Sequence, residues 1–446
     1  MDNKVLNSMK YRISLTLKTI RAATKPIVYI LIISALYSCA STGKSAIRKV
    51  SRKTLTKSFY QNQFTGIMIL DPENQDTLLS RNSDKYFTPA SNTKIFTFYT
   101  ALQFLPEKIP VINYTYLGDT LVISGTGDPT QFHPYFQDST LYHFLKKHDG
   151  PIAIHHPYFA DDPLGPGWAW DDYDQYYSAE RSSLPLYGNV LTIIKDDSLR
   201  TYPSLFREQL LPAAVSKKRS QEANVFFYDP DRTDTLEIPF KTDSMQIKLL
   251  LEKAIGRRLL QPPGKNTPMD RTLSGILTDS VLKRMMHESD NFLAEQLLLM
   301  VSNELSDSLS TDLARKYILS MSLSDLPQMP RWVDGSGLSR YNLFTPESMV
   351  HVLTKLYRQI PRQRLFDLFP AGGESSTLKD WFPGDSKPYI FAKSGTLGNN
   401  YNLSGYLITK KGKVLIFSFM NNHFRKPSAE IKTHMQEFLE GVRDHY

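Results

Sequence analysis

Ser91 and Lys94 have the residue types and the spacing of a nucleophile and its base. In the segment Ser91-Asn92-Thr93-Lys94 a helix would place the hydroxyl and the amine on one face, three residues apart. A neutral amine at that distance could take the hydroxyl proton and make the oxygen nucleophilic. The spacing alone is a weak indication, because a helix cap also explains the serine and the same spacing recurs at Ser41, Ser280 and Ser376.

Two further polar groups could serve such a nucleophile. Ser289-Asp290-Asn291 lies between two helical patterns, and Lys393-Ser394-Gly395-Thr396 lies on a predicted strand. Each group is common by itself, since Ser80-Arg81-Asn82 repeats the first pattern and capping explains most such triplets. The three groups in this order resemble the signature of the penicillin-recognising serine enzymes, so we interpret them as parts of one site.

The resemblance becomes specific over longer segments. Most of the chain beyond its N-terminal segment is similar to the D-alanyl-D-alanine carboxypeptidase/endopeptidases of the low-mass class C penicillin-binding proteins, the penicillin-binding protein 4 group. Ser394 departs from the family pattern, in which threonine is commoner, and FPAGGESSTLKDWF follows it only loosely. The family also suggests that Asp334, Ser336 and Arg340 border the cleft as structural or substrate-contact residues. The similar segments, in family order, are FTPASNTKIFT, SGTGDPT, GWAWDDYDQYYSAERSSLPLYGN, HESDNFLAEQLL, VDGSGLSRYNLFTPESM and FAKSGTLGNNYNLSGYL.

The resemblance implies an acyl-enzyme mechanism. Ser91 would attack the carbonyl between two D-alanines of a peptidoglycan stem peptide, with neutral Lys94 as its base, and water would later release the acyl group. Ser289 would relay the proton to the leaving amine, and Asn291 would hold the substrate's amide. A free lysine titrates near 10.4, so a pKa of about 7 for Lys94 needs a shift of about three units, which burial and the nearby cation of Lys393 could supply.

The same resemblance assigns the edge strand to the end of the substrate. Lys393, Ser394 and the hydroxyl of Thr396 would face the terminal carboxylate, and Gly395 would let the substrate backbone approach. The backbone N–H groups of Ser91 and Thr396 would form an oxyanion hole, where one donor typically contributes about 3 kcal/mol. Beta-lactams would bind in the same place, and no cofactor or metal is expected.

These groups must be positioned by helices and strands, and the order of the expected elements predicts an α+β fold. This fold has a transpeptidase-like core of antiparallel sheet and helices, with an inserted β-rich region. A strand pair and a helix that starts at Pro89 come first, then short β-like runs, two helical patterns, a three-stranded meander and a closing helix. The apolar spacing of the first helix predicts burial on one side. We expect residues 55–109 and 268–446 to form the catalytic domain and residues 110–267 to form the insertion.

The N-terminal segment carries an export pattern. Residues 1–53 hold eleven Lys or Arg and one acidic residue, which accounts for the net charge of +8 and leaves the rest of the chain close to neutral. A basic stretch up to Lys25 precedes an apolar run at residues 26–38. A membrane span needs about 20 apolar residues, so this run predicts a signal peptide over residues 1–38 instead.

Cys39 is the only cysteine of the chain. Leu36-Tyr37-Ser38 before it loosely resembles the box that precedes the lipidated cysteine of bacterial lipoproteins, although a signal peptide cut elsewhere is the alternative. The resemblance implies acylation of Cys39, a basic tether over residues 39–54, and a periplasmic protein held at a membrane by its lipid. Ala40 is not the aspartate that marks inner-membrane retention in many lipoproteins, which favours the outer membrane of a Gram-negative bacterium.

Other interpretations are open on the sequence alone. Five acidic residues of the inserted region resemble a metal cluster, but serine acyl transfer needs no metal and acidic loops are usually solvated; they are Asp161, Asp162, Asp171, Asp172 and Asp174. A class A β-lactamase would carry a Glu-X-X-Leu-Asn loop after the second motif, and a class C enzyme a tyrosine in place of Ser289. A non-catalytic binder of peptidoglycan would keep the same residues without turnover. Nucleic-acid binding would need a basic stripe on the body of the chain, which its near-neutral charge disfavours.

Overall fold

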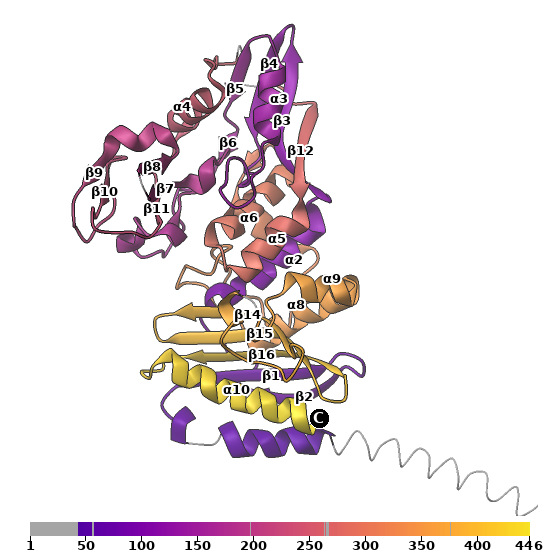
Figure 1. Ribbon diagram of the computed structural model, residues 1–446. Coiled ribbons are helices and arrows are strands. Elements are labelled where there is room, and N and C mark those ends of the chain that lie inside the picture. Colours follow the sequence, from indigo (N-terminus) through magenta and orange to yellow (C-terminus); the bar gives the residue numbers. More distant parts are fainter. Residues whose placement is uncertain (1–42, 56–57, 197, 263, 265–266, 375) are drawn as a thin grey trace, which may run out of the picture.

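Segments from both ends of the chain build one five-stranded antiparallel sheet, in the order β14-β15-β16-β1-β2 (Figure 1). The computed structural model describes residues 43–55, 58–196, 198–262, 264, 267–374 and 376–446. The predicted hairpin and meander are confirmed as β1 (Phe64–Asp71), β2 (Asp76–Arg81), β14 (Ile390–Leu397), β15 (Asn400–Ile408) and β16 (Val414–Asn422). β1 pairs with β16 from Phe64 opposite Asn422 to Leu70 opposite Ile416. This order leaves β14, with the predicted third motif, at one edge of the sheet.

Helices cover both faces of this sheet (Figure 1). α10 (Ser428–His445) lies on one face, and its apolar residues are buried as their spacing predicts. α8 (Pro346–Gln359) covers the other face, against β16 and β1. Side chains of β16 alternate between the two interiors, with Phe419 in the cluster on the α10 side and Met420 in the cluster on the other. The sheet is therefore the middle layer of the catalytic part.

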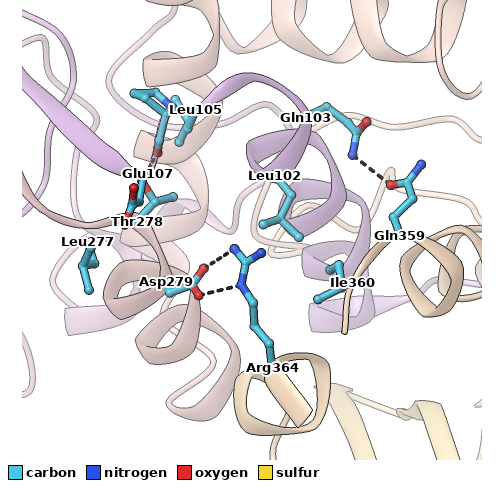
Figure 2. A pocket seen from close by; sticks show the side chains of 11 residues that line it. Leu102, Gln103, Leu105, Glu107, Leu277, Thr278, Asp279, Gln359, Ile360 and Arg364 are labelled. Atoms are coloured by element: carbon cyan, nitrogen blue, oxygen red, sulfur yellow. Dashed lines mark hydrogen bonds and ion pairs between the residues drawn. The ribbon is translucent and has the colours of Figure 1, made fainter. Parts of the chain in front are cut away.

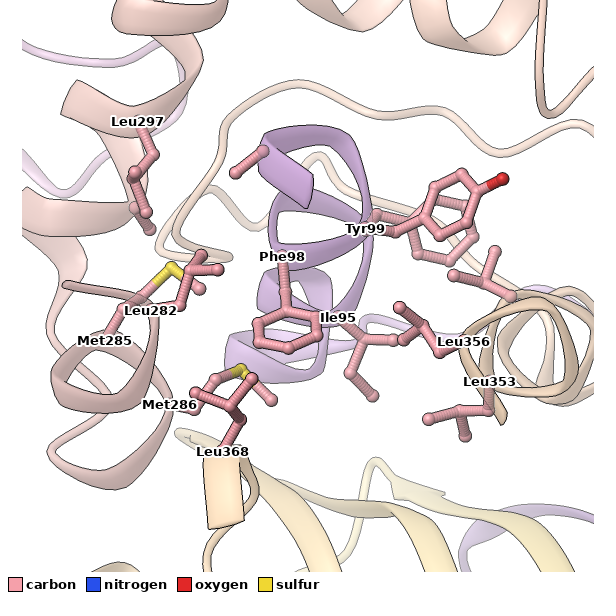
Figure 3. Packing of buried hydrophobic residues seen from close by; sticks show 14 of the residues in the cluster. Ile95, Phe98, Tyr99, Leu282, Met285, Met286, Leu297, Leu353, Leu356 and Leu368 are labelled. Carbon is pink, nitrogen blue, oxygen red and sulfur yellow. The ribbon is translucent and has the colours of Figure 1, made fainter. Parts of the chain in front are cut away.

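α2 (Lys94–Phe104) is buried on every side from Lys94 to Ala101, so the prediction of one-sided burial is wrong. Neighbouring helices surround it, which removes the need for a polar face. Figure 3 shows Phe98 directed toward Met285 and Met286 of α5, and Ile95 toward Leu356 of α8. The helices around it are α5 (Thr278–His287), α6 (Asn291–Leu305), α7 (Thr311–Ser320), α8 and, next to α5 and α8, α9 (Arg362–Leu368).

The inserted region has its own hydrophobic core and three further sheets, in the orders β12-β3-β4-β5, β11-β7-β8 and β10-β9. β12 (Arg271–Leu277) pairs with β3 (Lys108–Leu117), with Arg271 opposite Tyr114. The sheet of the insertion therefore extends past the predicted boundary at residue 267. The other elements here are β4 (Thr120–Gly125), α3 (Thr140–Lys147), β5 (Ile152–His155), β6 (Tyr158–Phe159), β7 (Val190–Lys195), β8 (Leu199–Tyr202), β9 (Leu210–Pro212), β10 (Phe226–Tyr228), β11 (Leu236–Pro239) and α4 (Ser244–Ile255), while β13 (Ser308–Leu309) pairs with β6.

Part of the predicted basic tether is a helix that packs on the catalytic part. Residues 43–55 are helical, and Ile47 and Leu55 are buried in the cluster on the α10 side. Lys44 forms an ion pair with Asp76 at 2.7 Å. The predictions of a signal peptide over residues 1–38 and of lipidation at Cys39 lie outside the described residues. Among the residues that are described, no helix has the length and apolarity that crossing a membrane requires.

Candidate active site

Ser91 lies in a short 3₁₀ turn, Ala90–Thr93, that leads into α2. Ala90 has a left-handed backbone (φ 48°), an uncommon conformation for a residue with a Cβ, and it is fully buried. Such strain persists only where the surrounding structure holds it, and it is frequent at functional sites. The turn leaves Ser91 half-buried, while Lys94 at the start of α2 is completely buried.

The amine of Lys94 joins the first two predicted motifs. Its Nζ donates to the Ser91 Oγ at 3.0 Å and to the Asn291 Oδ1 at 2.7 Å. A third acceptor, the carbonyl oxygen of Ser336, lies at 2.7 Å. Three acceptors satisfy the three protons of an ammonium group, and loss of one proton would leave a lone pair within reach of the Ser91 hydroxyl. The pair has the geometry of a nucleophile and its base.

The second motif is held at the start of α6. The Asp290 side chain caps this helix by accepting from the Leu293 N–H at 3.0 Å, and the Asn291 Nδ2 donates to the Tyr177 carbonyl at 3.0 Å. Ser289 has a left-handed backbone (φ 56°) and is half-buried. Its hydroxyl has no hydrogen-bond partner in the part of the chain that the structure describes, so the predicted proton relay through Ser289 stays a prediction.

The third motif on β14 lies against the Ser91 turn. A Cβ at Gly395 would come within 2.6 Å of the Pro89 carbonyl oxygen and 3.0 Å of the Ser91 nitrogen, so only glycine allows this approach. Thr396 is exposed, whereas Ser394 is buried. Lys393 is completely buried, and its Nζ donates to the Ser394 carbonyl at 2.8 Å. The predicted contact between Lys393 and a substrate carboxylate therefore stays a prediction.

Burial is the main cause of the unusual pKa values in the site. It lowers the pKa of Lys94 to about 8, against the raising effects of Asp290, Asp334 and Glu295. Burial, and then the charge of Lys94, hold the pKa of Lys393 well below its ordinary range. The expected lowering of the Lys94 pKa by burial is thus confirmed, whereas Lys393, the other expected cause, is not among the groups that shift it.

A loop that the sequence analysis described only as a border of the cleft binds the Lys94 amine. Its Asp334 carboxylate is fully buried and accepts from the backbone N–H groups of Gly337 and Ser339, at 2.9 Å and 2.6 Å. It also accepts from Asn342 Nδ2 at 2.6 Å and from Trp168 Nε1, in the insertion, at 2.9 Å. These bonds fix the loop whose Ser336 carbonyl receives Lys94.

The indication in the sequence was the run of small and turn-forming residues at 334–342, which favours a loop. Gly337 has φ 83°, and a Cβ there would lie 1.9 Å from the Ala90 carbonyl oxygen. The loop thus touches the Ser91 turn directly. Arg340, which the family resemblance grouped with Asp334 and Ser336, is exposed.

Three of the five acidic residues that resembled a metal cluster bind protein groups through their carboxylates. Asp161 pairs with Arg181 at 3.0 Å, Asp172 accepts from the Tyr177 hydroxyl, and the Asp174 carboxylate accepts from the Lys218 N–H. Within the described ranges no group of three or more His, Cys, Asp or Glu residues could hold a metal ion.

A cavity of about 490 Å³ opens at the other end of α2 (Figure 2). It is lined by Leu102, Gln103 and Ile360 among others, and Arg364 and Asp279 form an ion pair across it at 2.7 Å. None of the predicted site residues lines it. Because an α-helix rises about 1.5 Å per residue, Leu102 lies on the order of 15 Å from Ser91 along the helix axis. This cavity is not the site of the chemistry.

An antiparallel sheet between helices, with a serine and a buried lysine at the start of the central helix, defines the class of penicillin-recognising serine enzymes. The comparison with protein families places the chain within that class. The chain belongs to the D-Ala-D-Ala carboxypeptidase 3 (S13) family, whose model matches residues 49–207 and 261–442. Residues 208–260, between the two matched segments, all lie in the predicted insertion.

Relatives and solved structures agree with this assignment. The chain is 24% identical over 442 residues to the D-alanyl-D-alanine carboxypeptidase DacB of Haemophilus influenzae, covering 88% of this chain and 92% of that protein. It is also 24% identical over 434 residues to the D-alanyl-D-alanine carboxypeptidase of an Actinomadura species, covering 82% and 78%. The crystal structure of penicillin-binding protein 4 from Haemophilus influenzae matches with a TM-score of 0.67 at 20% identity, covering 89% of this chain and 98% of that one. The predicted transpeptidase-like α+β fold is thereby confirmed.

Proposed function

We propose that this chain is a serine-type D-Ala-D-Ala carboxypeptidase that acts on peptidoglycan stem peptides through an acyl-enzyme on Ser91. The observation that carries the proposal is the contact of the buried Lys94 amine with the Ser91 hydroxyl at 3.0 Å. With a pKa of about 8, Lys94 is neutral in a usable fraction of molecules near neutral pH. Family membership and the carboxypeptidase relatives support the same reaction.

In this mechanism the Ser91 oxygen attacks the carbonyl of the penultimate D-alanine while its proton passes to Lys94. The C–N bond to the terminal D-alanine then breaks, and the proton passes through the Ser289 hydroxyl to the leaving amine. Water adds to the acyl-enzyme and releases the shortened peptide and the Ser91 hydroxyl. The backbone N–H groups of Ser91 and Thr396 would stabilise the oxyanion, which suits the contact between β14 and the Ser91 turn.

The edge of β14 would receive the end of the substrate. Thr396 is exposed there and offers a hydroxyl to the terminal carboxylate, with Ser394 two positions earlier on the same strand face. Lys393 lies beneath and contributes positive potential to the extent that it is protonated. The side chain of Asn291 would bind the substrate's backbone amide after its Nδ2 gives up the hydrogen bond to the Tyr177 carbonyl. A β-lactam presents the same carbonyl and carboxylate, so it would acylate Ser91 too. A solved complex of penicillin-binding protein 4 from Haemophilus influenzae with a β-lactam supports this proposal.

Incubation of the purified chain with muropeptides tests the proposed function. We expect D-alanine to be released from a pentapeptide, and release to stop after treatment with penicillin. Cleavage of cross-linked dimers in the same assay would add endopeptidase action. Acylation by penicillin without any product would instead identify a non-catalytic binder, and rapid hydrolysis of penicillin would identify a β-lactamase.

We also propose that the chain is periplasmic and anchored in the outer membrane by acylated Cys39. Residues 40–42 separate Cys39 from the helix at residues 43–55, and this link can extend to about 14 Å at most. Arg48, Lys49 and Lys53 are exposed on this helix and would lie near the headgroups, where each cation contributes about 1 kcal/mol of attraction to anionic lipid. Substitution Cys39→Ser should move the protein from the membrane fraction to the soluble periplasmic fraction. Retention of the variant in the membrane would contradict the anchor.

A further inference from the structure

Glu295 is a buried carboxylate that the mechanism above does not use. It lies on α6, one turn after Asn291, and has no exposed surface. Its Oε1 accepts from the Ser336 N–H at 2.7 Å, and the carbonyl of the same Ser336 receives the Lys94 amine at 2.7 Å. Its other oxygen accepts no hydrogen bond within the described part of the chain. Burial raises the pKa of Glu295, and Arg181 opposes this effect. A buried carboxyl with an unpaired oxygen usually has a reason other than stability.

The free oxygen of Glu295 faces a charge from the inserted region. Arg181 Nη1 lies 3.5 Å from the Glu295 Oε2 and 3.0 Å from the Asp161 Oδ2. The Arg181 side chain is 2% exposed, and its remaining donors bind the carbonyls of Asp162 and Leu164. This guanidinium is therefore fixed in place, and a continuous chain of contacts runs from Asp161 through Arg181, Glu295 and Ser336 to Lys94.

We propose that Glu295 and Arg181 are positioning residues for Lys94. Glu295 fixes the Ser336 peptide that holds the amine, and Arg181 balances the Glu295 charge so that Lys94 can give up its proton. The inserted region thereby takes part in tuning the base. The inference rests on the proposed function, because it needs Lys94 to act as the base for Ser91.

The charges around Lys94 set the direction of each effect. Glu295, Asp290 and Asp334 favour the ammonium form, which opposes the burial that lowers the Lys94 pKa. Lys393 on β14 is the nearby cation, and the charge of Lys94 lowers the pKa of Lys393. Around Glu295 itself lie Asp334, Arg181 and, from α7, the buried Arg315; Asp161 lies on the far side of Arg181. Removal of the Glu295 charge should lower the Lys94 pKa, and removal of the Arg181 charge should raise it.

The test is the pH dependence of acylation by fluorescent penicillin in the full exported chain. The pH–rate profile of the wild type should have an acidic limb with its midpoint near pH 8, and below this pH the rate should fall about tenfold per pH unit. The reason is that the ammonium form of Lys94 cannot act as a base. Glu295→Gln keeps an acceptor for the Ser336 N–H and should move the limb to lower pH by about one unit, the order of magnitude for a nearby partly shielded charge. Arg181→Gln should move the limb to higher pH by a similar amount. At pH 6.5 the first variant should react about tenfold faster than the wild type and the second about tenfold slower.

Opposite shifts separate positioning from a structural role, which would slow both variants at every pH. Glu304→Gln removes the same charge nine residues further along α6 and should leave the limb in place. If thermal unfolding shows that Arg181→Gln does not fold, Asp161→Asn replaces it, and its limb should move to lower pH because Arg181 then acts on Glu295 alone. Limbs that stay at the wild-type pH, or that move in one direction for Glu295→Gln and Arg181→Gln, overturn the inference. Failure of the wild type to label and to release D-alanine would instead refute the proposed function.

Discussion

The substitution Ser91→Ala should abolish both covalent labelling by penicillin and the release of D-alanine. Loss of the nucleophile of a serine peptidase lowers kcat by a factor on the order of 10⁶, because the residual binding groups have no acyl acceptor to act upon. The fold should be retained, since Ser91 is half-buried and its removal costs one hydrogen bond from Lys94. Gel detection of a fluorescent penicillin and an amino-acid assay for D-alanine measure the two losses.

Ser280→Ala is the matched control for this experiment. Ser280 and Lys283 repeat the same spacing on α5, but Ser280 is exposed and Lys283 faces Asp367 on the surface, with 3.9 Å between Nζ and Oδ2. This variant should label and turn over like the wild type. Labelling that persists in Ser91→Ala, or that disappears in Ser280→Ala, would contradict the assignment of the nucleophile.

The substitution Lys94→Met should lower the acylation rate by about 10²- to 10⁴-fold, the usual contribution of a general base. Methionine fills most of the buried volume of lysine without an amine, so Ser91 keeps its place but loses its proton acceptor. The pH–rate profile of the variant should also lack the acidic limb with a midpoint near pH 8 that the Lys94 amine produces. Rapid-mixing measurements with a chromogenic β-lactam over pH 6 to 9 record both effects.

Stability must be measured beside the rate in this variant. The Asn291 Oδ1 and the Ser336 carbonyl each lose a donor, which costs about 1–3 kcal/mol apiece for buried acceptors. Thermal unfolding shows whether the variant is folded at the assay temperature. A folded Lys94→Met protein that acylates within tenfold of the wild type and keeps the limb near pH 8 would exclude Lys94 as the base.

Local patterns predicted most elements of the sheet and its covering helix. The strands of the meander are runs in which β-branched and aromatic residues are frequent, and α10 repeats apolar residues at helical spacing, so near neighbours in the chain suffice to specify them. α2 was predicted in the right place but with the wrong burial. Its surroundings come from α5, α6, α7 and α8, which lie almost 200 residues or more further along the chain, and no local pattern reports them.

The N-terminal segment illustrates the same limit. The sequence predicted a basic tether over residues 39–54, because composition does not report which apolar surface a segment meets after folding. Ile47 and Leu55 nevertheless find an apolar surface on the α10 side of the sheet, which is built from the other end of the chain. The pairing of β12 with β3 across the predicted boundary of the insertion is likewise a contact between distant segments, which local patterns do not report.

The order and types of the residues in the three motifs, together with the resemblance of the longer segments, were sufficient to indicate the family and the candidates Ser91, Lys94, Ser289 and Lys393. Residue type sets which proton or electron pair a side chain can offer, and this property is present before folding. The environment of each group came only from the tertiary structure. Burial of Lys94 and Lys393, the Ser336 carbonyl, and the Glu295–Arg181 contact all depend on segments that folding brings together, and pKa values follow distance and desolvation in space.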